Sequence, residues 1–478
     1  MGPGVLRGSC IRSETIASVD ALEYLSFVRE GLGNSSYLLF LAGRRAVLVD
    51  PDRTADRYVE AAAARGWEIA AVLETHLHAD FVTGSLEIRE ATAADVYLPT
   101  EARAGFPHCG LAAGDRVQIV DVEVEAIASP GHTPEHLSYV VRRSGSPPLL
   151  LSGGALIVGG AARTDLIAPD LTEELTRAEF RTLRGAFRAL PDETILLPTH
   201  GAGSFCSVGS GGDRTSTLGR ERAANPLLLM EDEEEFVRWF PTTFPGVPSY
   251  FSRMRPINQA GPRLRRDIDD PPPLSPEEFE LAQRQGAVVV DVRQPSDFAE
   301  AHVPHSIANP WREAYATWLG WVVEPDARLL FVTDGVPIEV VVDESLLVGY
   351  ERFAGYLDGG IESWDAAGKQ IALGAVIDVA EAAWAIQDGA AVLDVREPGE
   401  FESGHLPEAV HIPLGELASR LGELPRGRPI VTYCGSGARS TTAASLLERA
   451  GIGPALNLEG GFGAWRKAGN RVSRMRRG

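Results

Sequence analysis

The chain has 478 residues, 44% of them hydrophobic, which is more than one core of ordinary size can use, so about three domains are expected. Acidic residues outnumber basic ones and the formal net charge is -21, which argues against nucleic acid or an anionic membrane as a partner. The sequence contains no apolar run of the ~18 residues needed to span a bilayer. Because the negative charge also disfavours nucleic acid and anionic membranes, small molecules are the expected partners.

The N-terminal segment MGPGVLRGSC lacks the charged and apolar halves of a signal peptide, so a cytoplasmic location is expected. The four cysteines are spaced too widely for a disulfide framework, which suits a reducing compartment where thiols stay free. A cysteine with a function is then expected to act through a reactive thiol. They are Cys10, Cys109, Cys206 and Cys434. The oligomeric state is left open, a homo-oligomer included.

Histidines follow apolar, strand-like runs in the first half of the chain. In IAAVLETHLHAD, His76 and His78 alternate just beyond such a run, and Asp80 stands two residues further on. His132 in ASPGHTPEH and His200 in LLPTHGAG follow two other runs. Residues two apart in an extended segment project to the same side, and neutral imidazole is the commonest protein ligand for Zn and Fe. Each histidine alone has a structural explanation, but together these residues predict a metal site.

The segments ETHLHADFVTG, SPGHTPEHLSY, GGAARTD and LPTHGAGS resemble the metallo-β-lactamase fold, and within it the persulfide dioxygenase branch. The resemblance implies an αββα sandwich over residues 1–250 that holds one Fe(II) through His76, His132 and a carboxylate. It also implies that Arg163 faces the carboxylate of the substrate, with a surface ion pair as the alternative. Glyoxalase II type hydrolases of this fold use two zinc ions and need a histidine where this chain has Phe81, so a single metal is favoured.

The carboxylate ligand of that branch lies in a loop that reads GDAL, whereas this chain reads GGAL and has Gly154 there. Three interpretations are open. Two histidines and an exogenous anion or water hold the metal at reduced affinity, a neighbouring group replaces the carboxylate, or the domain has kept its fold and lost its chemistry. The candidate replacements are His78, Asp80 and Asp165. Because the other site residues are intact, a working iron site is favoured, and Gly154→Asp is expected to tighten iron binding.

A proline-rich stretch, DIDDPPPLSPEEF, predicts an extended linker, which we place at 251–273. Beyond it the chain repeats itself: VVVDVRQPSDF aligns with AVLDVREPGEF, and YLDGGIESW with NLEGGFGAW. Each copy opens with an apolar strand and ends in a Gly-Gly turn after a helical stretch. This pattern predicts two small α/β domains with parallel sheets, at 274–370 and 374–475.

The second copy carries the clearest chemistry, in PIVTYCGSGARSTTAASLLERAG. Cys434 follows an apolar strand, a loop of small residues leads to Arg439, and an amphipathic helix begins near Ser440. The inward N–H groups of such a loop and the helix dipole stabilise a thiolate, or a persulfide anion formed on it, and Arg439 adds a fixed cation. A buried structural cysteine is the alternative. The other loop residues are Gly435, Ser436, Gly437 and Ala438.

The segments DVREPGEFESGHLPEAVHIP, YCGSGARS and NLEGGFGAW resemble the rhodanese family of sulfurtransferases in order and spacing. The resemblance implies that Cys434 accepts a sulfane sulfur from a donor and passes it to a nucleophilic acceptor. Asp394 and Arg396 match structural supports beneath the loop. The short loop from Cys434 to Arg439 fits sulfur, whereas the related phosphatases carry a longer loop.

In the first copy the equivalent strand and loop read LLFVTDGVPIE, so Asp334 stands where Cys434 stands in the second copy. No arginine closes this loop, and a carboxylate cannot carry a persulfide, so this copy is expected to be non-catalytic, with a role in packing or channelling. His302 and His305 invite a metal interpretation. His302, however, matches His405 of the second copy and is expected to be structural.

The whole chain resembles persulfide dioxygenase–rhodanese fusion enzymes. The resemblance implies that O2 oxidises a low-molecular-weight thiol persulfide to sulfite, and that sulfur transfer through Cys434 interconverts sulfite and thiosulfate. Joining both activities in one chain raises the effective concentration of one product at the other site. Two alternatives stay open: a sulfurtransferase with a scaffold domain, favoured by Gly154, and a zinc thiolester hydrolase, which Phe81 argues against.

Overall fold

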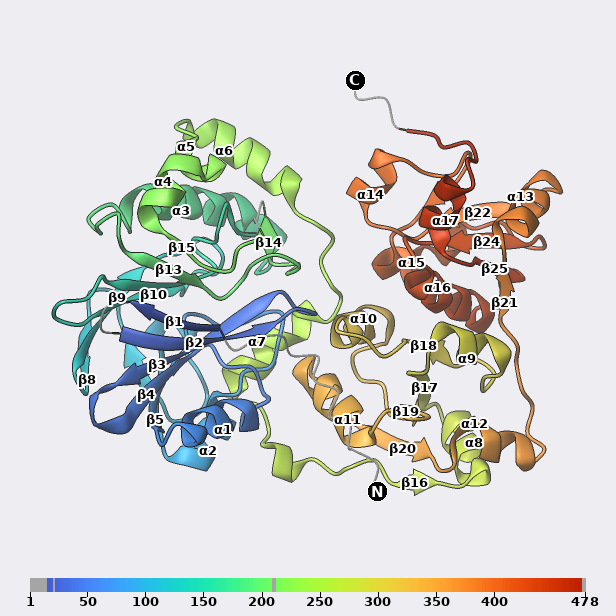
Figure 1. Cartoon of the computed structure of the whole chain (residues 1–478), viewed down its shortest axis with the longest axis horizontal. Helices are drawn as coiled ribbons and strands as arrows, with labels where there is room; N and C mark the ends of the chain where they lie inside the picture. Colours follow the sequence, from blue (N-terminus) through green and yellow to red (C-terminus); the bar gives the residue numbers. More distant parts are fainter. Residues whose placement is uncertain (1–14, 20–21, 209–211, 475–478) are drawn as a thin grey trace. The chain divides into compact units, whose positions relative to one another are not determined.

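The computed structural model describes residues 15–19, 22–208 and 212–474, and the chain divides into two compact units (Figure 1). The first unit contains the chain up to Ile268 together with Leu346–Gly349. The second contains Asp269–Ser345 and the chain from Tyr350 onwards. Within the described ranges, no helix combines the length and the apolar character that crossing a membrane requires.

The first unit is built on two β-sheets. One has the strand order β1-β2-β3-β4-β5-β6-β7 and the other β15-β13-β11-β10-β9-β8. The first sheet consists of β1 (Thr15–Val19), β2 (Leu22–Arg29), β3 (Asn34–Leu41), β4 (Arg45–Val49), β5 (Glu68–Leu73), β6 (Asp95–Pro99) and β7 (Cys109–Leu111). The second consists of β8 (Arg116–Ile119), β9 (Val122–Ala128), β10 (Leu137–Arg142), β11 (Leu149–Gly153), β13 (Ile195–Pro198) and β15 (Ser216–Thr217). A further small sheet pairs β12 (Ala161–Ala162) with β14 (Ser207–Val208).

The two sheets pack face to face around a shared core. Alternate residues of β9 are buried, and Val122 and Val124 contribute to a cluster that also contains Leu39 and Val47 of the first sheet. Because side chains of a strand point to opposite faces in turn, the period-two pattern of β9 places its apolar face on this core.

Helices cover the outer faces of both sheets (Figure 1). On the first sheet lie α1 (Asp56–Ala64) and α2 (Ser85–Thr92), and on the second lies α3 (Thr172–Gly185), which buries Phe180 and Leu183. The same side carries α4 (Leu218–Ala224), α5 (Pro226–Leu229) and α6 (Glu233–Trp239). The predicted αββα sandwich is confirmed.

The first unit extends further along the chain than the sequence suggests. Residues 251–268, assigned above to a linker, belong to this unit and contain helix α7 (Phe251–Ala260). The side-chain amide of Asn258 in α7 donates to the carbonyl groups of His78 and Phe81, at 2.9 Å each. Helix α7 therefore braces the histidine-bearing loop, and the first domain ends at Ile268 rather than near residue 250.

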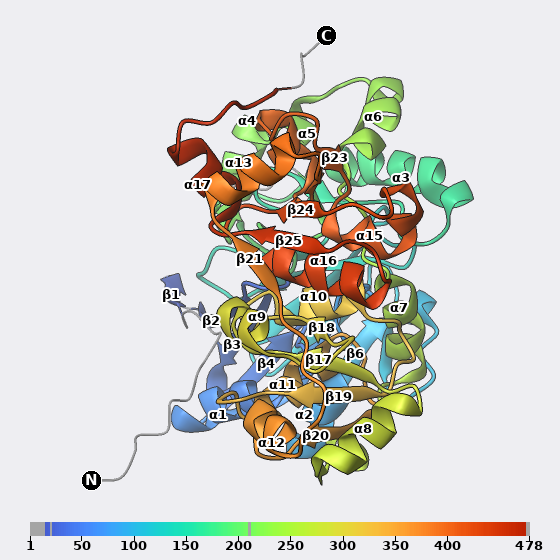
Figure 2. The same ribbon diagram turned by 90° about the vertical axis from the view of Figure 1, so that its right-hand side faces the viewer.

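The second unit contains two five-stranded sheets, both parallel throughout (Figure 2). Their strand orders, β16-β20-β19-β17-β18 and β21-β25-β24-β22-β23, are equivalent, which confirms the predicted pair of α/β domains. The first sheet consists of β16 (Pro273–Leu274), β17 (Val288–Asp291), β18 (Ile307–Ala308), β19 (Leu329–Val332) and β20 (Phe353–Leu357). The second consists of β21 (Ala375–Ile377), β22 (Ala391–Asp394), β23 (Val410–His411), β24 (Ile430–Tyr433) and β25 (Ala455–Leu458).

Five helices accompany each of these sheets. The first domain has α8 (Pro276–Arg284), α9 (Pro295–Glu300), α10 (Tyr315–Val322), α11 (Ile338–Leu347) and α12 (Gly360–Ala366). The second has α13 (Val379–Gln387), α14 (Pro398–Ser403), α15 (Leu414–Arg420), α16 (Ala438–Arg449) and α17 (Gly461–Lys467). Helices α8 and α13 both begin with a capping box, formed by Ser275 with Glu278 and by Asp378 with Glu381, so the repeat extends to the helix caps.

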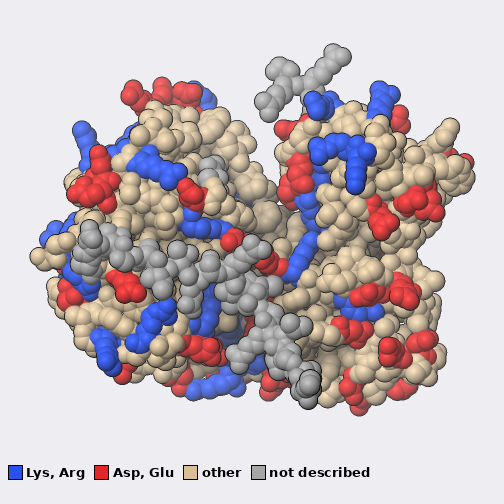
Figure 3. All heavy atoms as spheres, in the orientation of Figure 1, with Lys and Arg blue, Asp and Glu red and all other residues tan. Residues whose placement is uncertain are grey.

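Charged side chains are interspersed by sign on the face drawn in Figure 3. Acidic and basic groups alternate over that surface although the chain as a whole carries a formal charge of -21. Such a surface favours solubility and offers small anions local basic sites rather than one extended field.

Candidate metal centre and sulfur-transfer site

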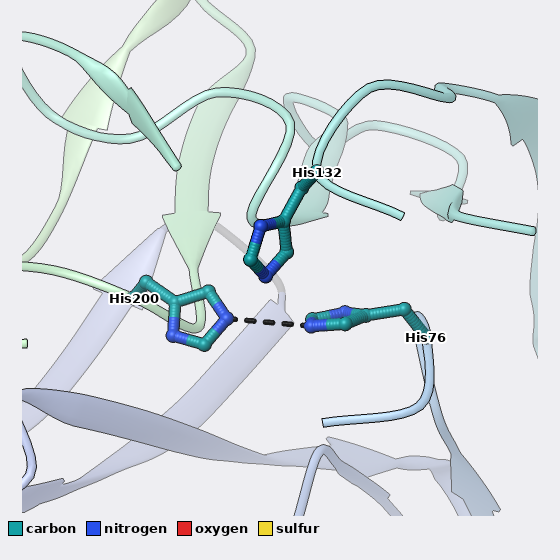
Figure 4. A group of neighbouring side chains, drawn as sticks. All are labelled: His76, His132 and His200. Atoms are coloured by element: carbon teal, nitrogen blue, oxygen red, sulfur yellow. Dashed lines mark hydrogen bonds between the residues drawn. The ribbon is translucent and has the colours of Figure 1, made fainter. Parts of the chain in front are cut away.

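Three histidines from three loops meet in the first unit (Figure 4). His76 follows β5, His132 follows β9 and His200 follows β13. Each is at most 1% exposed, and their ligand nitrogen atoms all lie within 4.8 Å of one another. The Nε2 atoms of His76 and His200 are 3.3 Å apart. The structure thus brings together three of the histidines that the sequence assigns to a metal.

The orientation of His132 and His76 is set by groups behind them. The Nδ1 atom of His132 donates to the carbonyl oxygen of Arg163 at 2.6 Å. The Nδ1 atom of His76 lies 2.8 Å from the hydroxyl of Thr75, whose own proton goes to Asp50 at 2.8 Å. Because each Nδ1 atom faces an acceptor and carries the proton, each Nε2 atom presents a lone pair to the cluster.

His200 is held by a carboxylate. Its Nδ1 atom lies 3.3 Å from Asp80, which also accepts a hydrogen bond of 2.8 Å from the side chain of Asn34. Burial opposes ionisation of Asp80, but the interaction with His200 outweighs it and lowers the pKa of the carboxyl to about 2. Asp80 is therefore an anion that orients His200. Its other carboxylate oxygen, Oδ1, is buried and has no hydrogen-bond partner in the described part of the chain, so its predicted role as a metal ligand stays a prediction.

The three imidazoles are suited to a cation. Burial, reinforced by neighbouring imidazoles, holds the pKa values of His76 and His132 well below the usual range, so both rings are neutral at physiological pH. The Nε2 atom of His132 is buried and has no hydrogen-bond partner in the described part of the chain. An orphaned donor nitrogen that faces two other imidazoles fits a metal ion such as Fe(II) or Zn(II).

His78, also predicted as a ligand, faces two carboxylates. Its Nε2 atom lies 3.1 Å from Glu74 and 3.3 Å from Asp50. Burial alone would lower its pKa, but Asp50 and Glu74 raise it to about 10, so the ring is an imidazolium. The potential ligand atoms of His78, Asp80 and His200 also lie within 4.8 Å of one another, yet His78 has no free lone pair while it remains protonated.

Gly154 lies against His132 rather than beside an open gap. A Cβ atom at this position would be 2.6 Å from Cδ2 of His132 and 3.0 Å from Cβ of Ala162. The expectation that Gly154→Asp tightens iron binding therefore has to be revised, because the imidazole of His132 would have to move before an aspartate could enter.

His136, which the sequence reasoning missed, fills the space behind the glycines. Its Nε2 atom accepts a hydrogen bond of 3.0 Å from the amide of Gly154, and its Nδ1 atom lies 2.8 Å from Ser129. A Cβ atom at Gly153 would be 2.4 Å from the same Nε2 atom. The signal was present in SPGHTPEH, where His136 stands four residues after His132.

Arg163 is buried, and its guanidinium group is occupied by protein groups. The guanidinium forms a bidentate ion pair with Asp165, at 2.6 and 2.8 Å. It also donates hydrogen bonds of 3.2 Å to the carbonyl oxygens of Phe205 and Gly246. Asp165, one of the suggested replacement ligands, uses both of its carboxylate oxygens in the ion pair with Arg163. A role of Arg163 in binding substrate stays a prediction.

Cys434 lies at the end of β24, where its thiol is surrounded by donors. The sulfur atom accepts hydrogen bonds from the amide of Gly437 at 3.1 Å and from the hydroxyl of Ser440 at 3.5 Å. Burial opposes the thiolate, but the hydrogen bonds from Ser440 and the loop amides, together with Arg439, lower the pKa of Cys434 below its usual value. The loop from 434 to 439 thus stabilises an anionic sulfur at the beginning of α16.

Removal of the Ser440 hydroxyl tests this account. In Ser440→Ala the thiolate loses one donor, so the pKa of Cys434 rises and the thiol reacts more slowly below that pKa, by roughly 3- to 10-fold. The measurement is the rate of alkylation of Cys434 by iodoacetamide as a function of pH. Thr442→Ala, elsewhere on α16, is the control, and an unchanged pH profile in Ser440→Ala would contradict the account.

Arg439 carries a partner that the sequence reasoning missed. Its guanidinium forms a two-pronged ion pair with Glu400 of α14, at 2.7 and 2.8 Å. Beneath the loop, Arg396 pairs with buried Asp394 at 2.6 Å and donates to the carbonyl of Gly404 at 2.7 Å. Asp394 and Arg396 thus make the supporting contacts implied by the rhodanese resemblance.

The loop of the first copy has a different character. Asp334 follows β19, and its carboxylate lies 3.6 Å from Arg293 and accepts a hydrogen bond of 3.3 Å from the amide of Ile361. The position equivalent to Arg439 is Glu339, in the first turn of α11. A carboxyl side chain therefore stands where the second copy has an arginine.

The variant Asp334→Cys tests whether a cysteine alone restores the function of the first copy. We expect no gained sulfur transfer, because Arg439 has no counterpart in this loop, where Glu339 occupies the equivalent position. Transfer from thiosulfate to cyanide is measured in Asp334→Cys with Cys434→Ser as the background. Activity above that of the Cys434→Ser protein would contradict the prediction.

His302 is used within the second unit rather than for a metal. Its Nδ1 atom donates to the carbonyl of Phe298 at 2.8 Å, and its Nε2 atom lies 2.9 Å from Glu448. In the second copy His405 donates to Phe401 in the same way, at 3.0 Å. The shared contact gives both histidines a structural role.

Comparisons with known proteins agree with this architecture. The profile of the Metallo-beta-lactamase superfamily matches residues 29–200, and that of the Rhodanese-like domain matches 275–367 and 378–468. A hydroxyacylglutathione hydrolase of Pseudomonas entomophila is 34% identical over 45% of this chain and 90% of its own length. The human mitochondrial persulfide dioxygenase ETHE1 is 27% identical over 40% of this chain and 69% of its own length.

One solved structure can be superimposed on a larger part of the chain. A metallo-beta-lactamase from Staphylococcus aureus subsp. aureus COL is 26% identical, with a TM-score of 0.62, over 71% of this chain and 99% of that one. The order of domains matches that of a persulfide dioxygenase–rhodanese fusion protein. The chain therefore belongs to the metallo-beta-lactamase superfamily through its first domain and to the rhodanese-like family through the two domains that follow.

Proposed function

We propose that the first domain is a mononuclear Fe(II) persulfide dioxygenase and that the last domain transfers sulfur through Cys434. The observation that carries the first part is the convergence of three histidines, His76, His132 and His200, on one point. It offers a single metal position with three imidazole nitrogen ligands, in place of the two histidines and one carboxylate expected from the resemblance. The likeness to human persulfide dioxygenase ETHE1 supports this reaction class.

The proposed oxidation takes a thiol persulfide, O2 and water to the parent thiol, sulfite and two protons. Iron at the histidines would supply the site at which O2 and the terminal sulfur react. The surrounding protein fixes the tautomers of the three histidines through Arg163, Thr75 and Asp80. It also buries the cluster, which limits the access of water.

The proposed transfer uses the anionic sulfur of Cys434. The thiolate attacks the terminal sulfur of a persulfide or thiosulfate, the sulfur–sulfur bond of the donor breaks, and a thiolate or sulfite leaves with the electron pair. Sulfite can then take the sulfur from the Cys434 persulfide, which gives thiosulfate. The substrates are small sulfur compounds, and we place the reaction in the cytoplasm.

A second candidate is a thiolester hydrolase with two zinc ions, which the 34% identical hydroxyacylglutathione hydrolase favours. The position and the packing of Phe81 argue against this hydrolase. Phe81 stands where such enzymes need a second-metal ligand, and its ring stacks on His78 at 4.3 Å between centroids. A third candidate, a sulfurtransferase whose first domain is a scaffold, is favoured by Gly154.

Three measurements on the full chain separate these candidates. The protein is expressed in iron-supplied medium, its metal content is determined, and O2 uptake with glutathione persulfide and hydrolysis of a hydroxyacylglutathione are assayed. The proposal expects about one iron per chain and persulfide-dependent O2 uptake. Two zinc ions with thiolester hydrolysis would replace it by the hydrolase, and absence of metal and of O2 uptake would leave the sulfurtransferase.

A further inference from the structure

The non-catalytic domain is docked on the helix that follows the catalytic loop. Both rhodanese-like domains belong to one compact unit, in which β18 packs against α16 and α10 packs against α15. The amide of Ala308 donates to the hydroxyl of Ser445 in α16 at 3.0 Å. His302 pairs with Glu448 of the same helix. These contacts fix the non-catalytic domain against the frame that carries Cys434.

The close packing extends to the segment between β18 and α10. A Cβ atom at Gly415, in α15, would lie 2.2 Å from the ring of Trp321, in α10. The segment itself is tied to its own sheet, because the amide of Asn309 donates to Asp291 at 2.9 Å and that of Trp311 to Val292 at 2.8 Å. Arg312, the next residue, is therefore held at this interface by its backbone.

Arg312 is a half-buried cation whose hydrogen-bonding groups are not all used. Its Nε and Nη2 atoms are buried, and neither has an acceptor within the described ranges. The ring of Trp318 lies 5.9 Å from the guanidinium carbon. Burial lowers the pKa of Arg312, and the two charges that act on it are those of Cys434 and Arg439, both in the other domain. A desolvated guanidinium with unsatisfied donors is costly unless an anion binds there.

An oxoanion substrate at Cys434 would bind a cation that has no other partner, and Arg439 is not such a cation. Its guanidinium is neutralised by Glu400, which accepts from both terminal nitrogens. An oxoanion that approached Arg439 would first have to compete with that carboxylate. Arg312, in contrast, lies near enough to Cys434 and Arg439 for their charges to act on it, and it has no carboxylate partner among the ion pairs of the described residues.

We propose that Arg312 of the non-catalytic domain binds the oxoanion part of thiosulfate or sulfite at Cys434, so that both rhodanese-like domains share one site. The inference rests on the proposed sulfur transfer. In the forward step the Cys434 thiolate attacks the outer sulfur of thiosulfate, and sulfite leaves with the electron pair of the broken bond. In the reverse step sulfite attacks the outer sulfur of the Cys434 persulfide. Arg312 binds the charged –SO3 group in both directions and transfers no proton.

The test compares an acceptor that is an oxoanion, sulfite, with a thiol acceptor, dithiothreitol. The Cys434 persulfide is formed in the full chain with excess thiosulfate, verified by mass, freed of donor, and mixed with either sulfite or dithiothreitol in single turnover. In Arg312→Gln the sulfite concentration at half-maximal rate rises by about tenfold or more, because a charge-assisted hydrogen bond is lost. The rate with dithiothreitol, which reacts as a thiolate, stays within about twofold of wild type, since it has no oxoanion group for the guanidinium to bind.

Two further variants complete the experiment. Arg312→Lys keeps the charge and recovers part of the sulfite dependence, and it serves as the test variant should thermal unfolding show that Arg312→Gln is not folded. Arg352→Gln removes an exposed arginine of the same domain and leaves both reactions unchanged.

The outcomes separate the inference from the function beneath it. An unchanged sulfite dependence in the Arg312 variants, or an equal loss with both acceptors, would overturn the role of Arg312 while wild type still transfers sulfur. Failure of the wild-type Cys434 persulfide to react with either acceptor would overturn the proposed sulfur transfer, and the inference with it.

Discussion

Replacement of Cys434 by serine abolishes sulfur transfer from thiosulfate to cyanide, with an expected loss of at least about 1,000-fold. A serine hydroxyl stays protonated at neutral pH and forms no persulfide, whereas the loop amides and the hydroxyl of Ser440 stabilise the anion of Cys434. The measurement is the steady-state formation of thiocyanate by the full chain.

The control for this prediction is Cys109→Ser, which removes an exposed cysteine of the first domain. It should leave the transfer rate unchanged. Persulfide-dependent O2 uptake should be the same in wild type and Cys434→Ser, because the proposed oxidation does not use this thiol. Retention of more than a few per cent of the transfer rate in Cys434→Ser would refute the assignment of Cys434.

The second large effect is expected at the metal site. His132→Ala removes one of three nitrogen ligands, so metal affinity falls by at least about 100-fold and persulfide-dependent O2 uptake is lost. The content of iron after dialysis against a weak chelator and the rate of O2 consumption are measured side by side. His108→Ala, which changes a histidine outside the cluster, is the control and should keep both.

Variants at Gly154 decide whether the lost carboxylate can be replaced. Gly154→Ala adds a Cβ atom that would lie 2.6 Å from the ring of His132, and Gly154→Asp adds the same atom with a carboxylate beyond it. Because the imidazole must move in both, we expect neither variant to bind iron more tightly than wild type. Tighter iron in Gly154→Asp but not in Gly154→Ala would show that the aspartate ligates and that His132 moves at little cost.

Much of the architecture could be predicted from the sequence, because the relevant signals are local. The apolar strand, the loop from Cys434 to Arg439 and the following helix are contiguous, and their chemistry depends on amides of the same loop. The repeat indicated two domains of one fold, since equivalent residues such as Asp291 and Asp394 serve the same support. The αββα sandwich was implied by the resemblance of the histidine-bearing segments to the metallo-β-lactamase fold.

The partners of these residues could not be predicted in the same way, because they are distant in the chain. The sequence groups His78 with His76. The protonation of His78 depends, however, on Asp50, which is 28 positions away in the chain and whose carboxylate lies 3.3 Å from Nε2 of His78. Helix α7 lies in the segment that the proline-rich stretch after it led us to assign to a linker, although Asn258 in this helix binds the loop that carries His78.

The sequence by itself therefore determined which residues are chemically able to act, the histidines and Cys434, and that an aspartate stands in place of the cysteine in the first rhodanese-like copy. Only the tertiary structure decided which of them act together. It selected His76, His132 and His200 as one cluster, placed His136 behind Gly154, and brought Arg312 to the catalytic domain. The physical reason is that charge, burial and lone-pair direction depend on neighbours in space, and a linear pattern records only neighbours along the chain.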